Sequence, residues 1–139
     1  MKAQARVHQY PVIRRFMTPA PHTIGRNQTL AVAERMMRDH DIRHLPVLEG
    51  GEIVGMLSHR DVLFVEALPG TRPAEILVEE AMVETVVSAS PDTPLAEAVE
   101  EMARRKIGST VVTEGGHVVG VFTTTDALNA LAELLSAEG

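Results

Sequence analysis

The 139-residue chain contains no cysteine and no tryptophan, and aromatic residues make up only 3% of it. Without cysteine it has no disulfide, thiolate nucleophile or zinc–thiolate site, which fits a reducing cytoplasm. Scarce aromatic rings argue against binding single-stranded nucleic acid by base stacking. No apolar run approaches the roughly 20 residues that a membrane span needs, and the polar N-terminus lacks a signal-peptide core. These absences predict a soluble cytoplasmic protein with neither a membrane nor a nucleic-acid partner.

Charge is distributed unevenly along the chain, whose net charge is −6. Residues 1–72 carry 10 basic and 7 acidic side chains (+3), and residues 73–139 carry 3 and 12 (−9). The overall acidity argues against a general DNA-binding protein. A polyanionic ligand would favour the basic half.

The most informative pattern is a repeat, because residues 45–61 correspond without a gap to residues 110–126. In both copies two apolar runs flank Glu-Gly-Gly, which predicts a β-hairpin with a glycine turn. The second run ends in Gly-x-x-Ser/Thr-x-x-Asp, formed by Gly55, Ser58 and Asp61 in one copy and by Gly120, Thr123 and Asp126 in the other. A hydroxyl followed three residues later by an aspartate predicts a helix start that could also hold a ligand.

The repeat extends to the helices, with about a third of positions identical between residues 17–63 and 82–128. Each copy has an apolar stripe typical of an amphipathic helix, at Leu30, Ala33 and Met37 and at Leu95, Ala98 and Met102. These helices are predicted to end near Asp41 and Lys106, and a second helix follows each motif. The predicted organisation is an N-terminal arm (1–11), repeat 1 (12–68), a linker (69–76), repeat 2 (77–135) and a tail (136–139).

Each repeat is too small to close its own core comfortably. We therefore expect an α/β (α+β) fold in which two β-α-β-β-α repeats pack face to face around a pseudo-two-fold axis. Such packing would leave two equivalent clefts.

The segments Ile42–Val47 and Val54–Asp61, separated by the Gly-Gly turn, resemble the CBS domain, a family named after cystathionine β-synthase. The resemblance covers about residues 12–135 and leaves no room for a catalytic domain. It implies clefts that bind adenosine-containing ligands such as AMP, ADP, ATP or S-adenosylmethionine. It also implies a homodimer.

The resemblance places ribose binding on Asp61 and Asp126, whose carboxylates have only acceptors and suit the two donors of a ribose diol. The Ser58 and Thr123 hydroxyls, beside the amides of a helix start, suit a phosphate. Further phosphate-binding candidates are Arg43, His44 and Arg60. The positions that hold adenine in the family correspond to His22, Ile42, Val87 and Ile107.

The two repeats differ at the cations. Gly108 and Ser109 replace Arg43 and His44, and threonines replace His59 and Arg60. One cleft is therefore expected to accommodate a di- or triphosphate better than the other. Both His22 and the Thr110-Val111 pair depart from the family pattern and could narrow or close a cleft.

Our first hypothesis is a non-catalytic regulatory module that binds an adenosyl ligand, dimerises and acts on an effector protein. The alternative is a ligand-free dimerisation or docking scaffold, in which both aspartates are plain helix caps and the arginines form surface ion pairs. An enzyme is a third hypothesis, but no catalytic arrangement is evident. His40 and His44 have a chelating i, i+4 spacing, yet the helix is predicted to end between them and no third ligand is evident, so no metal is expected. Glu79, Glu80, Glu100 and Glu101 are expected on solvated faces.

Overall fold

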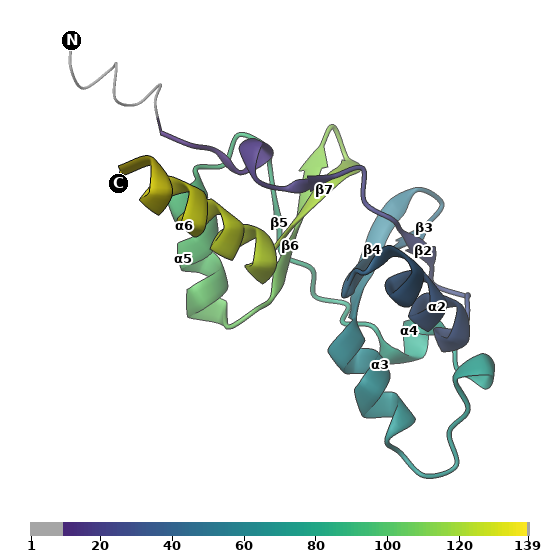
Figure 1. Ribbon diagram of the computed structural model, residues 1–139. Coiled ribbons are helices and arrows are strands. Elements are labelled where there is room, and N and C mark those ends of the chain that lie inside the picture. Colours follow the sequence, from purple (N-terminus) through teal and green to yellow (C-terminus); the bar gives the residue numbers. More distant parts are fainter. Residues whose placement is uncertain (1–9, 139) are drawn as a thin grey trace. The chain divides into compact units, whose positions relative to one another are not determined.

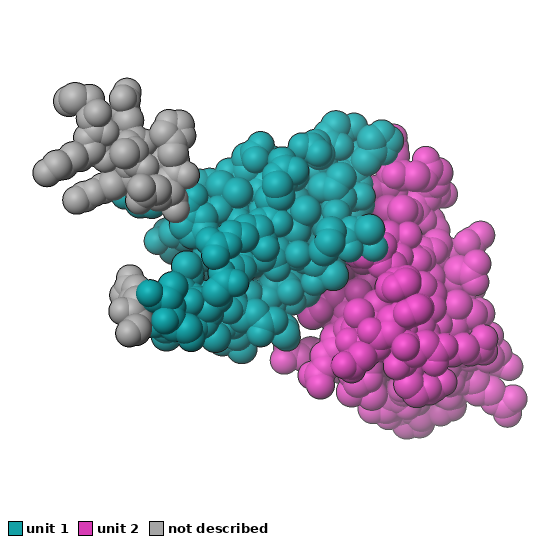
Figure 2. Space-filling view, turned by 45° about the horizontal axis from the view of Figure 1, so that its top comes forward, with its two compact units in different colours: residues 1–20, 87–139 teal, residues 21–86 magenta. Residues whose placement is uncertain are grey.

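The structure is a computed structural model that describes residues 10–138, so most of the predicted N-terminal arm lies outside the described residues. The described residues form a mixed α+β fold with two small sheets and five α-helices, which confirms the predicted class (Figure 1). It divides into two compact units (Figure 2): unit 1 comprises residues 1–20 and 87–139, and unit 2 comprises residues 21–86.

Unit 2 contains a three-stranded sheet in the order β2-β3-β4. Strand β2 is parallel to β3, and β3 is antiparallel to β4. Its elements are β2 (Ile24–Gly25), α2 (Leu30–His40), β3 (His44–Glu49), β4 (Glu52–Ser58), α3 (His59–Glu66), the 3-10 turn η2 (Pro73–Glu75) and α4 (Val78–Ala81).

Unit 1 repeats this plan with a four-stranded sheet in the order β1-β7-β6-β5. Its elements are the 3-10 turn η1 (Ile13–Arg15), β1 (Thr18–Pro19), β5 (Ser88–Ala89), α5 (Leu95–Arg105), β6 (Ser109–Glu114), β7 (His117–Thr123) and α6 (Thr124–Glu138). Helix α6 continues through most of the predicted tail.

Backbone conformations that glycine favours occur where the repeat predicts them. Gly50 and Gly51 turn the β3–β4 hairpin with φ of 58° and 84°, and Gly115 and Gly116 do the same in unit 1. Helices α2 and α5 end as predicted, with Asp41 and Lys106 left-handed at φ of 52° and 55°. This repetition at an offset of 65 residues supports the duplication.

Each unit has its own hydrophobic core, and the predicted helix stripes lie in it. Leu30, Ala33 and Met37 of α2 pack with buried residues of β3 and β4. Leu95, Ala98 and Met102 of α5 pack with Val112, Phe122 and Ala130. Among residues 10–138, no helix is both long enough and apolar enough to cross a membrane.

Each compact unit also contains the segment with which the other repeat begins. Residues 11–19, here called the N-terminal segment, lie in unit 1, where β1 pairs with β7. Residues 76–83, the connecting segment, lie in unit 2, where Val83 and Met56 exchange two backbone hydrogen bonds of 2.9 Å. The compact units therefore do not coincide with the predicted repeats. Below, the body of a unit means the unit without this segment.

Candidate functional site

In unit 2 the motif residues meet where strand β4 passes into helix α3. The Ser58 hydroxyl accepts from the Asp61 amide (3.1 Å), while Asp61 Oδ2 accepts from the Ser58 amide (2.9 Å) and hydroxyl (2.8 Å). This reciprocal pair is a capping box, and it fixes the carboxylate at the helix N-terminus. The capping box engages Asp61 through Oδ2 and does not involve Asp61 Oδ1.

In unit 1 the equivalent carboxylate is engaged on both oxygens. Asp126 Oδ2 accepts from the Thr123 amide (2.9 Å), and the Thr123 hydroxyl accepts from the Asp126 amide (3.2 Å). The Thr18 hydroxyl of the N-terminal segment donates to Asp126 Oδ1 at 3.2 Å and lies 3.4 Å from Oδ2. Asp126 is only 9% exposed. At the position equivalent to Thr18, unit 2 has Val83, which has no side-chain donor.

The predicted phosphate-binding residues of unit 2 lie at the same end of the β3–β4 hairpin, away from the glycine turn. His44 pairs with Ser58 across the strands, and the Arg43 carbonyl accepts from the His59 amide at 2.8 Å. Arg60 lies in the first turn of α3. Neither Arg43 nor Arg60 forms an ion pair with a described residue. Unit 1 has the same backbone arrangement without these cations, because Gly108 and Ser109 occupy the strand end there.

The predicted adenine positions lie at two places in each unit. In unit 2, Ile42 follows the end of α2, and the His22 ring stacks on His40 with ring centroids 3.7 Å apart. In unit 1, Ile107 follows the end of α5, and the Val87 carbonyl accepts from Val111 of β6 at 2.9 Å.

The structure also bears on the His40–His44 pair. Helix α2 ends at His40, as predicted, and His44 begins β3. Within residues 10–138, no group of three or more His, Cys, Asp or Glu side chains could hold a metal ion.

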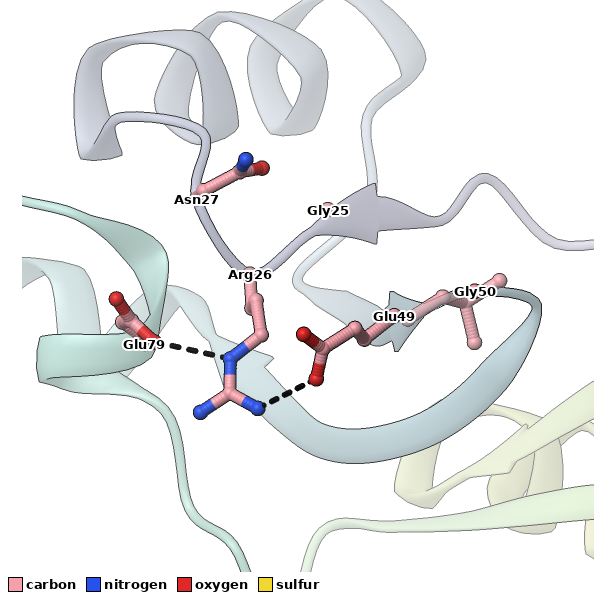
Figure 3. Close-up of a pocket in the computed structure, with 7 residues that line it drawn as sticks. Gly25, Arg26, Asn27, Glu49, Gly50 and Glu79 are labelled. Atoms are coloured by element: carbon pink, nitrogen blue, oxygen red, sulfur yellow. Dashed lines mark hydrogen bonds and ion pairs between the residues drawn. The ribbon is translucent and has the colours of Figure 1, made fainter.

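A pocket of about 490 Å³ lies elsewhere in unit 2 and was not predicted (Figure 3). Arg26 lies between two carboxylates there, with Nη1 2.7 Å from Glu49 and Nε 2.9 Å from Glu79. Hydrogen bonds to Glu49 and then Glu79 raise the pKa of Arg26. Since two glutamates neutralise this arginine, the pocket offers an anion no uncompensated cation.

Two glutamates expected on solvated faces are in fact paired. The Glu79 side chain is only 35% exposed and pairs with Arg26. Glu101 pairs with Arg104 and Arg105 one turn away on α5.

The family model of the CBS domain matches residues 12–67 and 78–133. The chain therefore belongs to the CBS domain family and contains two such domains in tandem. It is 30% identical over 121 residues to the CBS domain-containing protein YhcV of Bacillus subtilis, covering 86% of each protein. It is 33% identical over 126 residues to inosine-5'-monophosphate dehydrogenase of Korarchaeum cryptofilum, but spans only 24% of that enzyme.

Solved structures share the fold over nearly the whole chain. A Vibrio cholerae protein provisionally described as the acetoin utilization protein AcuB superposes with a TM-score of 0.82 at 30% identity, covering 93% of this chain and 96% of that one. The CBS domain pair of protein MJ0100 gives 0.77 at 21% identity, with coverages of 94% and 99%. CBSX2 gives 0.75 at 20% identity, with coverages of 88% and 97%. The last two likenesses establish the fold alone.

Proposed function

We propose that this CBS-domain pair is a non-catalytic, cytoplasmic regulatory module that binds an adenosine-containing ligand: AMP, ADP, ATP or S-adenosylmethionine. The observation that carries the proposal is the aspartate–hydroxyl pair, which recurs in both units at the junction of a strand and a helix. Two neighbours support the ligand class, since MJ0100 was crystallised with 5'-methylthioadenosine and S-adenosylmethionine and CBSX2 with AMP.

In unit 2, Asp61 binds the ribose through Oδ1, the oxygen that the capping box leaves available. The two hydroxyls of a ribose diol can each donate a hydrogen bond, and a carboxylate has only acceptors, so the two groups are complementary. Ser58 and the amides at the start of α3 face the phosphate, where the helix dipole favours a negative charge. Arg43, His44 and Arg60 supply further positive charge for a longer phosphate chain.

In unit 1, Asp126 and Thr123 have the corresponding roles, but Thr18 competes with the ribose for Asp126. The absence of an arginine beside Thr123 favours a ligand with fewer phosphates there. His22 and Ile42 in unit 2, and Val87 and Ile107 in unit 1, contact the adenine. Because the cationic side chains lie in unit 2, the ligand with more phosphates binds there.

Thermal unfolding with AMP, ADP, ATP, S-adenosylmethionine and NADH tests the proposal. A ligand at one hundred times its dissociation constant adds about 2.7 kcal/mol to the free energy of unfolding. Asp61→Asn keeps an oxygen that can accept the capping bond, so it should abolish the ligand-induced shift without a large loss of stability. Asp39→Asn, an exposed change on α2, is the matched control. Unchanged melting curves with every adenosyl compound would favour the ligand-free scaffold.

We also propose that the module is a homodimer held by the outer faces of α3 and α6. Exposed apolar side chains occur on both helices: Leu63 and Phe64 on α3, and Leu128, Leu131 and Leu135 on α6. Their exposed fractions range from 51% to 69%, and such clusters on small proteins mark interaction surfaces. A second copy presents the same faces, as a closed two-fold interface requires.

A further inference from the structure

The N-terminal and connecting segments dock on their units through equivalent backbone contacts. In unit 1, the Ile13 amide donates to the Thr93 carbonyl (2.9 Å) and the Arg14 amide donates to the Pro91 carbonyl (3.0 Å). Sixty-five residues later, in unit 2, the corresponding bonds run from Val78 to Gln28 (2.7 Å) and from Glu79 to Arg26 (3.0 Å). The backbone contacts therefore do not distinguish one segment from the other.

The apolar anchors are also nearly interchangeable. Ile13 and Val78 are both fully buried and differ by one methylene. The second anchor is a methionine in each segment, which packs against the glycine of the motif: Met17 on Gly120 and Met82 on Gly55. A difference of one methylene gives only weak discrimination.

The charges, by contrast, are reversed between the units. In unit 1 the arginine is on the segment: Arg14 lies 3.2 Å from Asp92 and 3.4 Å from Glu114 of the body. In unit 2 the arginine is on the body: Arg26 pairs with Glu79 of the segment at 2.9 Å and with Glu49 of the hairpin at 2.7 Å (Figure 3). Glu49 and Glu114 are equivalent hairpin residues and carry the same charge. The charges therefore differ only on the segments, at Arg14 and Glu79, and on the bodies, at Arg26 and Asp92.

We infer that these charges select which segment docks on which body. Exchanging the segments would place Glu79 beside Asp92 and Glu114, and would place Arg14 beside Arg26 and Glu49, where the two arginines would compete for one carboxylate. Each ion pair is partly exposed and contributes little alone. Selection, however, depends on the difference in free energy between two dockings. The exchanged docking loses the Arg14–Asp92, Arg14–Glu114 and Arg26–Glu79 pairs and gains repulsion of Glu79 by two carboxylates and of Arg14 by Arg26. The acidic body of unit 1 thus accepts a basic segment, and Arg26 of unit 2 accepts an acidic one.

Disulfide trapping tests this inference directly, because the chain has no cysteine of its own. Thr18→Cys with Val121→Cys reports the observed docking, since these residues are partners in the β1–β7 ladder and antiparallel partners lie within disulfide range. Thr18→Cys with Met56→Cys reports the exchanged docking, because Met56 is the partner of Val83. Intact mass separates bonds within a chain from bonds between chains.

Each cysteine pair is then combined with Arg14→Glu and Glu79→Arg, which exchange the segment charges and leave the net charge unchanged. We expect the ratio of Thr18–Met56 to Thr18–Val121 bonds to rise roughly tenfold or more over the natural background. An unchanged ratio would overturn the inference and leave chain connectivity as the determinant. Arg35→Glu with Glu97→Arg is the charge-matched control, because both side chains are exposed without an ion pair to any described residue; it should leave the ratio unchanged.

A variant with four substitutions distinguishes a change of docking from unfolding. Adding Asp92→Arg and Arg26→Glu to the exchanged pair restores opposite charges in both units. This variant should fold and return the Thr18–Val121 bond to its natural yield. Failure of the fourfold variant to restore that bond would overturn the inference. Ligand binding is not needed for any of these readouts.

Discussion

Gly55→Ala provides a sharp test of how the connecting segment is held. A Cβ at position 55 would lie 2.6 Å from Met82 Sδ and 3.0 Å from the Val83 carbonyl oxygen. The sulfur can move, but the carbonyl is fixed by its 2.9 Å hydrogen bond to the Met56 amide. Such overpacking costs about 1–3 kcal/mol. At about 4 °C per kcal/mol for a chain of this size, the melting temperature should fall by about 4–12 °C.

A double-mutant cycle with Met82→Ala separates the two contacts. If the sulfur carries part of the clash, Gly55→Ala should cost about 1 kcal/mol less in the Met82→Ala background, measured by urea unfolding. Hydrogen exchange at the Val83 amide should accelerate in Gly55→Ala because the segment is displaced. Gly25→Ala is a milder control, since its nearest atom is a side-chain oxygen of Asn27 at 3.3 Å. Natural stability in Gly55→Ala would refute the close-approach explanation, whereas additivity with Met82→Ala would assign the clash to the Val83 carbonyl alone.

Three further predictions address Asp126, a carboxyl pair and the helix faces. Thr18→Val removes a donor from the nearly buried Asp126 carboxylate and should lower the free energy of unfolding by about 1–2 kcal/mol in urea titrations; no change would show that water replaces the hydroxyl. A hydrogen bond to Glu34 raises the pKa of Glu66 from its ordinary 4.5, so the stabilising protonated form is lost as pH rises through the raised value. Glu66→Gln should therefore melt higher than the natural protein at pH 7 but not below about pH 4; equal curves at pH 7 would contradict this. Leu63→Glu and Leu131→Glu should each shift the sedimentation coefficient from dimer to monomer, and an unshifted dimer would exclude these faces.

Local signals in the sequence were enough to predict most of the fold. The Gly-Gly pairs predicted both hairpin turns, because only glycine takes two successive positive φ angles at no steric cost. The stripe from Leu30 to Met37 predicted the buried face of α2, and its counterpart predicted that of α5. These features depend on residues that are close in the chain.

The segment docking could not be predicted in the same way. Ile13 and Val78 have the same polarity and nearly the same size, so the apolar pattern is compatible with either partner. The contacts of Thr18 with Asp126 and of Glu79 with Arg26 join residues 108 and 53 positions apart, and their geometry depends on which body each segment covers. At the candidate site, the sequence predicted that an aspartate and a hydroxyl lie together at the start of a helix, and the structure shows this pair in both units. It did not reveal that the capping box engages Asp61 through one oxygen, while Thr18 of the N-terminal segment binds Asp126.

The placement of the segments also affects how a chain with only one repeat could fold. A single repeat would carry a segment suited to a body that it does not itself possess, and its own body would lack the strand and apolar anchor supplied by the other repeat. A second molecule could provide them. A one-repeat ancestor of this protein is therefore expected to have folded by reciprocal exchange between two identical chains, and gene duplication would have made that partnership permanent within one polypeptide.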